Sequence, residues 1–559
     1  MLEKLTAKQK KWVDSVFRSL TEDEKIGQLI DERGKYVMSR GVPAAEWLKK
    51  YPIGAIFTGS EVIDDFREKN GTATTLRQAV SAAKLKLPIL FNGDFENGVG
   101  GNIDGFTTLP RLMGVSATFS EKNYYDYGRV IGTEGRALNI RWAFGPVSDL
   151  NLNRENPITN IRSAGDDPDH AIKVLTGIVK GMQEHGVAAC LKHFPGDGTD
   201  TRNQHFVTSH NVLSKKEWDQ MHGRVFRALI EAGAMSVMIG HIAFPAYEPE
   251  DRQKGLWRPA TCSKRIMTDL LRGELGFDGI IVSDALTMAG YLSWGDYETR
   301  ILDSFNGGVD IFLWPEPEKF FPLMRAALKD GRASKKRLEE SVKRVLAFKA
   351  LLGLMPDDVS EESEANLPAL LRENQKTAMR ISEDSITLLR NRNNILPLKL
   401  KKGARILLFF SPNLPGPNKH LQKFADKLSE RGFRVTVAHS SDFDMLVNLI
   451  DAFDSVMYLS DAHPQYVVHR GFEDVLWSYM RHMPQMKNPV FISFGTPYFL
   501  YDVAAAPTYI NAYHDCDNSL EAVIRAIFGE IPIKGQSPVC VPNCFLFGEG
   551  MKLKKKKRS

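Results

Sequence analysis

The spacing of short β-branched or aromatic runs along about the first 350 residues constrains the fold most strongly. Seven such runs recur at intervals of roughly 30 to 50 residues, and each precedes a polar loop and a helical pattern. The expected strands are residues 53–57, 87–91, 140–144, 187–191, 235–239, 279–282 and 309–313. These intervals are too long for hairpins, so the strands should lie parallel. They predict an α/β fold, with a (β/α)8-like barrel favoured over an open sheet.

A second domain should follow, because 559 residues are too many for one hydrophobic core. A helix predicted over residues 333–352 ends at Gly353, and the acidic stretch 356–364 has little apolar content. We therefore predict a barrel over 1–353, a linker over 354–376, a smaller α/β sandwich over 377–550 and a basic tail over 551–559. In the sandwich, helix 378–389 should lead into a strand, and the other expected strands are 405–410, 434–438, 455–459, 490–494 and 508–512.

The charge of the chain is concentrated at its end. The net charge is +5, and six basic residues lie in the last eight, which leaves 67 basic against 68 acidic residues in the rest. We expect a solvated tail, with contact to an anionic surface or a nuclear-import-like signal as alternatives. The nearly neutral body predicts no nucleic-acid partner, and a polar amino terminus without long apolar runs predicts no secretory signal and no membrane partner. Five scattered cysteines indicate reduced thiols and a cytoplasmic protein.

Polar residues follow five of the expected strands, where ligands bind in a parallel barrel. They are Asp94, Glu96, Asp149, Lys192, His193, His241 and Asp284. A single aspartate at such a place is more often a helix cap than a catalyst, and Asp284 on its own fits either interpretation. The set as a whole combines carboxylates with histidine on a glycine-rich loop. That combination suits a reaction that needs a nucleophile and a mobile proton donor.

Other chemistries fit the same segments less well. Four histidines could bind a metal beside Asp197 or Asp200: His193, His205, His210 and His241. None of them has the helical spacing that is typical of metal ligands. Residues 93–101 are rich in glycine but contain Asp94 and Glu96, which would repel a phosphate. Cys190 lies within an apolar strand, which favours a place in the core. We expect no metal and no cofactor.

Several motifs together resemble glycoside hydrolase family 3, in its β-N-acetylglucosaminidase branch. Residues 192–198 read KHFPGDG and resemble the KHFPGHG signature, with Asp197 in place of the second histidine. Four further segments match family motifs in order. The D-x-E turn is matched by residues 94–96, and the F-[AG]-P-V-x-D strand end by residues 144–149. The R-S-F-G-x-D-P loop is matched by residues 161–168, and the G-F-x-G-x-x-x-S-D nucleophile segment by residues 276–284. Residues 382–398 and 535–550 resemble the start and end of the family's second domain.

The resemblance implies a retaining double displacement with Asp284 as the nucleophile and His205 as the acid/base. The aspartate that should polarise this histidine is replaced by Asn203, and we expect Asp200 or Asp197 to take over. The residues implied to bind the sugar are Asp94, Asp149, Arg162, Lys192 and His193. His241 resembles the family's A-H-I strand end, so it should either support the residues that contact the sugar or form the wall of a subsite.

These implications predict an exo-acting β-N-acetylglucosaminidase that acts on muropeptide-derived or chitin-derived sugars, with a homodimer as one expected assembly. A β-glucosidase or a phosphorylase of the same family is the enzymatic alternative, because a histidine acid/base does not repel phosphate as a carboxylate would. A catalytically impaired sugar-binding protein is the alternative from another class, with Asn203 as the sign of decay. The role of the second domain stays open.

Overall fold

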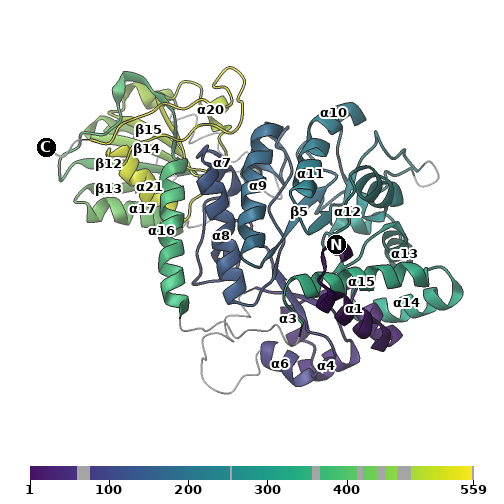
Figure 1. The fold of residues 1–559 in the computed structure, drawn as a ribbon. Helices are drawn as coiled ribbons and strands as arrows, with labels where there is room; N and C mark the ends of the chain where they lie inside the picture. The colour runs from purple at the N-terminus through teal and green to yellow at the C-terminus, as the bar shows by residue number, and fades with distance from the viewer. Residues whose placement is uncertain are drawn as a thin grey trace. The chain divides into compact units, whose positions relative to one another are not determined.

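A computed structural model describes residues 1–59, 76–251, 255–355, 366–411, 419–438, 447–461 and 480–556 (Figure 1). They form two compact units. The first comprises Met1–Thr107, Gly128–Leu150 and Leu175–Arg372, and the second comprises Thr108–Tyr127, Asn151–Val174 and Glu373–Ser559. The domain boundaries inferred from the sequence stay a prediction, and part of the predicted linker, 356–365, lies outside the described residues.

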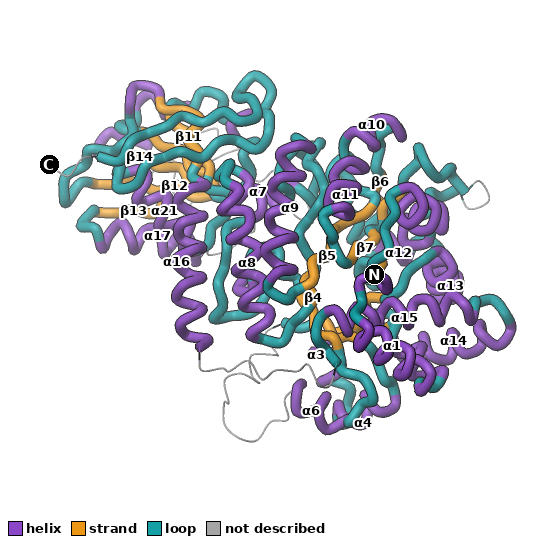
Figure 2. The backbone as a smooth tube through the Cα atoms, viewed as in Figure 1, coloured by secondary structure: helices purple, strands orange, loops and turns teal. Residues whose placement is uncertain are grey.

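The first unit contains an eight-stranded parallel sheet in the order β10-β1-β2-β3-β4-β5-β7-β9. Figure 2 labels β4, β5 and β7 among its strands, which are drawn in orange. Its strands are β1 (Ile30–Arg33), β2 (Ala55–Phe57), β3 (Leu90–Gly93), β4 (Trp142–Ala143), β5 (Ala188–Phe194), β7 (Ser236–Ile239), β9 (Ile280–Ser283) and β10 (Phe312–Leu313). A bridge between Val282 and Ile311 joins the two ends. The nearly closed sheet confirms the predicted barrel class.

Helices alternate with these strands as the sequence predicted. They include α1 (Ala7–Ser19), α2 (Glu22–Gly27), α4 (Ala44–Lys50), α6 (Leu76–Ala83), α8 (Glu121–Ala137), α9 (Pro168–Glu184), α10 (Lys215–Gln220), α11 (His222–Glu231), α12 (Ala289–Leu292), α13 (Tyr297–Gly307), α14 (Pro317–Asp330) and α15 (Lys335–Leu351). A short parallel pair, β6 (Ser209–His210) with β8 (Ile242–Ala243), lies outside the barrel sheet.

The second unit is built on a six-stranded sheet in the order β11-β16-β15-β14-β12-β13. Its strands are β11 (Thr387–Asn391), β12 (Arg405–Ser411), β13 (Arg434–Ala438), β14 (Ser455–Ser460), β15 (Pro489–Ser493) and β16 (Thr508–Asn511), and only β11 runs antiparallel to its neighbour. Alternate residues of β12 and β14 enter two separate hydrophobic clusters, one on each face. Helices α17 (Lys419–Glu430) and α21 (Asp517–Ile527) belong to one of these clusters, so the sheet has the covered faces of a sandwich.

The carboxyl-terminal segment differs from the expected solvated tail. Its backbone pairs with the second unit through Leu553 and Ile533, and Lys556 N donates to the Gly529 carbonyl at 2.9 Å. Leu553 packs against the sheet cluster, which explains why the chain stays attached as far as Lys556. Residues 557–559 of the predicted tail lie outside the described residues.

Among the described residues, no helix combines the length and the apolar character needed to cross a lipid bilayer. All five cysteines are free thiols. Cys190 is buried in β5, and burial raises the pKa of its thiol to about 12, which agrees with a place in the core.

Candidate active site

The carboxyl ends of the barrel strands bring six of the predicted site residues to one end of the first unit. Lys192 and His193 lie near the carboxyl end of β5. Asp94 and Asp284 directly follow β3 and β9, and His241 lies two residues after the end of β7. Asp149 joins them because Ser148 N donates to the Lys192 carbonyl at 2.6 Å, which ties the segment after β4 to β5.

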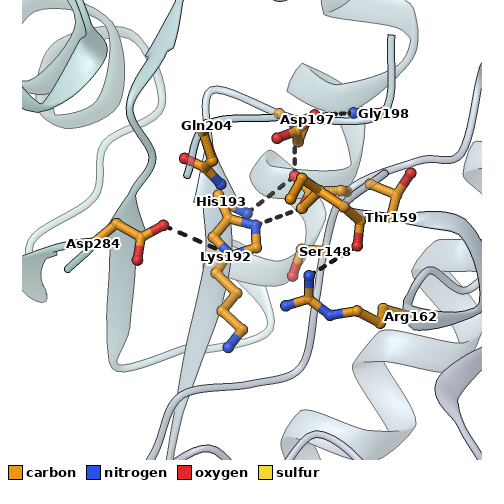
Figure 3. Close-up of polar contacts among 12 residues, drawn as sticks. Ser148, Thr159, Arg162, Lys192, His193, Asp197, Gly198, Gln204 and Asp284 are labelled. Atoms are coloured by element: carbon orange, nitrogen blue, oxygen red, sulfur yellow. Dashed lines mark hydrogen bonds and ion pairs between the residues drawn. The ribbon is translucent and has the colours of Figure 1, made fainter. Parts of the chain in front are cut away.

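His193 lies between two carboxylates. Its Nδ1 is 2.8 Å from Asp149 Oδ2, and its Nε2 is 4.0 Å from Asp284 Oδ2, as Figure 3 shows for Asp284. Asp149 Oδ1 also accepts from His193 N at 3.0 Å and from Asp197 N at 2.7 Å. Burial alone raises the pKa of Asp149, but the charge and hydrogen bonds of His193 outweigh it and lower that pKa below its usual value. Asp149 is therefore a buried anion that fixes the orientation of His193.

Lys192 bridges two carboxylates at the opposite side of the same strand end. Its side chain is only 4% exposed, and its Nζ lies 2.9 Å from Asp94 Oδ1 and 2.7 Å from Glu96 Oε1. A lysine that is paired twice has a fixed position, so its ammonium and the more exposed Asp94 can be presented together to a polar ligand. Glu96 completes this arrangement, and it was absent from the residues that the resemblance assigned to sugar binding.

Asp284 is suited to act as a nucleophile. Burial favours the neutral acid, but the electrostatic interaction with His193, the nearby His241 ring and a hydrogen bond from Ala285 N together outweigh burial, so the pKa of Asp284 is lowered. The Ala285 bond is 2.7 Å long and engages Oδ1. Oδ2 faces His193, and the carboxylate is held in its anionic form.

His241 supports the segment that carries Asp284. Its ring nitrogens contact Thr261 Oγ1 at 2.9 Å and the Ala285 carbonyl at 3.0 Å, and its backbone N donates to Gln204 Oε1 at 2.8 Å. Burial lowers the pKa of His241, so its ring is neutral near neutral pH. The contacts join the nucleophile segment to the loop that contains Gln204.

That loop carries the predicted acid/base pair. Asn203 Oδ1 accepts from the backbone N of His205 at 3.0 Å and lies 2.7 Å from its Nδ1. A backbone N–H is always a donor, so the Asn203 atom must be the oxygen, and His205 Nδ1 must carry the hydrogen. The contact at Nδ1 fixes the ring in the orientation that an aspartate at position 203 would also give.

The structure differs from our expectation about the missing carboxylate. Asp200 accepts from His210 N at 3.0 Å and pairs with Arg202 Nε at 2.8 Å, and Asp197 Oδ1 accepts from Gly198 N. Burial raises the pKa of Asp200, but His210 and Arg202 outweigh it and bring it to about 2. The partner of His205 Nδ1 is the side-chain oxygen of Asn203. The backbone turn between the two residues, in which this oxygen also accepts from His205 N, places it beside Nδ1.

The acid/base loop is also tied to the segment after Asp284. Ala289 N donates to the His205 carbonyl at 3.0 Å, and Gly290 N donates to the Gln204 carbonyl at 3.2 Å. A side chain at Gly290 would approach the Gln204 carbonyl to 2.5 Å. The glycine therefore permits a close backbone contact that sets His205 relative to the nucleophile segment.

Arg162, implied to bind the sugar, and His210, considered as a metal ligand, each contact other groups. Arg162 belongs to the second unit, where its guanidinium donates to the Ile158 carbonyl at 2.8 Å. His210 is buried in β6 beside Asp200. Among the residues that the structure describes, no group of three or more potential ligands is arranged to hold a metal ion.

The sequence did not predict the polar and aromatic residues at the ends of β1 and β10. Asn92 donates to Asp31 Oδ2 at 2.8 Å, and burial raises the pKa of Asp31 well above its usual value. Arg33 lies 4.9 Å from the centre of the Trp314 ring, which also contacts Phe57 edge-on. The sequence predicts seven strands, and a closed barrel needs eight. This shortfall indicates one further strand, which the structure places before residue 53 as β1.

Comparisons with known proteins find relatives over most of the chain. The model of the family described as "Glycosyl hydrolase family 3 N terminal domain" matches residues 21–348. A "Beta-N-acetylglucosaminidase/beta-glucosidase" of Cellulomonas fimi is 33% identical, over 94% of this chain and 95% of the relative.

Solved structures are similar over the whole length. The "Beta-glucoside phosphorylase BglX bound to 2FGlc" has a TM-score of 0.84 and 29% identity, and the comparison covers 96% of this chain and 97% of that one. A family 3 β-N-acetylglucosaminidase from Paenibacillus sp. str. FPU-7 has a TM-score of 0.80 and 25% identity, over 93% of this chain and 99% of that one.

Proposed function

This chain belongs to glycoside hydrolase family 3, and we propose that it is a retaining exo-glycosidase that releases terminal β-N-acetylglucosamine from glycosides. The observation that carries the proposal is the anionic Asp284, which lies at a strand end opposite His193 and is tied by its own segment to the loop of His205. A nucleophile and a proton donor are thereby held in one site, as a double displacement requires.

In the first step, a carboxylate oxygen of Asp284 attacks the anomeric carbon. The bond from that carbon to the leaving oxygen breaks, and protonated His205 gives its Nε2 proton to the departing oxygen. The result is a glycosyl ester on Asp284 and a free alcohol. In the second step, neutral His205 takes a proton from water, which attacks the same carbon and restores the carboxylate of Asp284.

Sugar binding falls to the charged groups around this pair. We assign hydroxyl and acetamide contacts to Asp94, Lys192, His193 and Asp149, and to Arg162 on the resemblance alone. Hydrogen bonds to charged groups are stronger than those between neutral groups, so they hold a neutral sugar well. Lys192 and Asp94 support this role best, because their 2.9 Å contact offers a donor and an acceptor side by side.

Phosphorolysis is the second candidate, supported by the amide groups beside His205. In the described part of the chain, the buried Asn203 Nδ2 and Gln204 Nε2 have no hydrogen-bond acceptor. A phosphate oxygen is a strong acceptor, and the amide of Asn203 does not repel it as an aspartate would. Phosphate would replace water in the second step and release the sugar 1-phosphate. A β-glucosidase fits the same site as a β-N-acetylglucosaminidase, because their substrates differ only in the group at the second carbon of the sugar, a hydroxyl in place of an acetamide.

The impaired sugar-binding protein is disfavoured by the same geometry. Asp284 keeps an anionic carboxylate, and His205 keeps the ring orientation that catalysis needs. Loss of the dyad carboxylate changes the charge beside the ring and leaves the other catalytic groups in place.

The test is covalent trapping at the nucleophile. A fluorinated aryl glycoside should form a stable adduct on the peptide that contains Asp284, detected by mass spectrometry. Asp284→Ala should lose the adduct and turn over an aryl β-N-acetylglucosaminide on the order of 10⁴-fold more slowly, because no other group can form the intermediate. An adduct on a different residue, or turnover that survives in Asp284→Ala, would contradict the assignment.

Substrate class and acceptor are separated by one panel. Aryl β-N-acetylglucosaminide and aryl β-glucoside are compared with and without phosphate, and the product is identified. Release of free N-acetylglucosamine in both buffers supports the hydrolase. Sugar 1-phosphate formed only with phosphate supports the phosphorylase.

We place the enzyme in the cytoplasm, where it would act on muropeptide-derived or chitin-derived sugars in cell-wall recycling. The five free cysteines support a reducing compartment. A homodimer is also part of this proposal, and sedimentation velocity would test it.

A further inference from the structure

The end of the chain is fixed to the second unit by a regular pattern of contacts. Met551 N donates to the Leu388 carbonyl at 2.7 Å, and Leu553 exchanges two backbone hydrogen bonds with Ile533, at 2.9 and 3.0 Å. Lys556 N then bonds to the Gly529 carbonyl. The lysines of this segment therefore occupy defined places on the unit.

An alternation of side chains directs these lysines outward. Leu553 packs against the sheet cluster, whereas its neighbours Lys552 and Lys554 are exposed, as expected for an extended segment with one face on the protein. Lys555 and Lys556 are exposed as well.

A second group of lysines lies beside the first. Lys399, Lys401 and Lys402 precede β12, and all three are exposed. Lys556 Nζ donates to the Leu398 carbonyl at 2.9 Å, and the charge of Lys399 acts on Lys556. The two groups form what we call the basic surface: Lys399, Lys401, Lys402, Lys552, Lys554, Lys555 and Lys556.

No carboxylate pairs with these seven lysines in the described part of the chain. Several other cations of the second unit are paired, such as Lys534 with Asp384 at 2.8 Å and Arg431 with Glu521 at 2.9 Å. Since the rest of the chain carries about as many acidic as basic residues, the excess positive charge is concentrated here. Unpaired like charges repel one another, so the basic surface should be stabilised by an anionic partner.

We propose that the basic surface binds the surface of an anionic lipid bilayer. Clusters of four to eight basic residues are typical of proteins that bind anionic lipids on the cytoplasmic leaflet. Lysine is a point charge that suits a diffuse field, whereas specific phosphate or nucleic-acid recognition favours arginine. Exposed Met551, at 43%, can enter the headgroup region.

This inference changes one expectation from the sequence, which was that the protein has no membrane partner. The anchored tail is the new observation, because it adds the tail lysines to those before β12. The proposal does not depend on the glycosidase activity, since none of the seven lysines belongs to the active site.

The test is vesicle cosedimentation of the full chain. Vesicles of phosphatidylglycerol and phosphatidylcholine, roughly one-third anionic, should bind the protein at about 0.1 M salt and release it at about 1 M, where charges are screened within about 3 Å. The triple variant Lys552→Gln, Lys554→Gln, Lys555→Gln should bind about 100-fold more weakly, because each lysine near the surface contributes about fivefold.

A matched control separates the surface from the total charge. The variant Lys10→Gln, Lys335→Gln, Lys336→Gln removes the same charge from exposed positions of the first unit and should keep binding within about twofold. Equal weakening of both variants, binding to phosphatidylcholine alone, or no binding to anionic vesicles would overturn the proposal. Binding to a single-stranded oligonucleotide without binding to vesicles would also overturn it, and unchanged turnover in both variants would confirm that they are folded.

Discussion

Two histidines of the first unit have the same kind of contact at Nδ1 but different partners. His193 lies in β5 and contacts the carboxylate of Asp149 at 2.8 Å, and His205 lies on a loop and contacts the amide oxygen of Asn203 at 2.7 Å. Both partners also accept the backbone N–H of the histidine they hold. The geometry of the two pairs is therefore nearly equal, and the charge differs.

The difference separates orientation from charge. Asp149 orients His193 and brings a buried negative charge to it, and the interaction with His193 lowers the pKa of Asp149. Asn203 orients His205, but an amide cannot stabilise imidazolium as a carboxylate does. A histidine that must gain and lose a proton in each cycle can work without a permanent counter-charge, provided that it is held in place.

The largest effect that bears on this comparison is expected at His205. His205→Ala should lower kcat/KM by about 10² to 10⁴ for a substrate with a poor leaving group, because general acid catalysis contributes that much. An aryl glycoside with a good leaving group should lose far less, and it serves as the internal control in the same assay. Equal losses on both substrates would remove His205 from the acid role and end the comparison of the two pairs.

A smaller effect is expected at the partner of His193. Asp149→Asn keeps the shape but removes a buried charge that accepts three hydrogen bonds, so it should lower the free energy of unfolding by about 3 kcal/mol. Its pKa is lowered in the folded state, so its contribution is present above the usual value of 3.8 and is lost as pH falls below it.

Urea unfolding at neutral and acidic pH checks this prediction. Wild type and Asp149→Asn should differ most at neutral pH and converge as the pH falls below about 4. A constant difference at all pH values would mean that Asp149 acts through packing, and the contrast with Asn203 would then lose its electrostatic basis.

The barrel could be predicted from the sequence because seven of its strands are short apolar runs bounded by polar loops. The eighth, β1, was missed because three of its four residues, Asp31, Glu32 and Arg33, are charged. Asp31 has a partner in Asn92 of β3, two strands away in the sheet, and a single sequence does not display such a contact.

The site was predictable to a similar degree and for similar reasons. Asp149, Lys192, His193 and Asp284 could be found because each lies at a strand end, where chain order determines position. The partner of His205 could not, because the loop places three candidate side chains within a few residues of one another. Only the backbone turn, in which Asn203 Oδ1 accepts from His205 N, decides among them.

The smallest effect, and the sharpest test of the comparison, is expected at Asn203. Asn203→Asp gives His205 the carboxylate that His193 has, so imidazolium is stabilised and the basic limb of the pH profile of kcat/KM should move up by about one pH unit. The new second oxygen would occupy the buried place of Asn203 Nδ2, where the described residues offer no hydrogen-bond partner, so the shift should be smaller than an exposed pair of ideal geometry would give. The control Asn306→Asp makes the same charge change at an exposed position of α13 and should leave the limb unmoved. If the basic limb of the kcat/KM profile also stays in place in Asn203→Asp, His205 does not carry the titrating proton. If it shifts, the charge at position 203 is the property that distinguishes the two histidines.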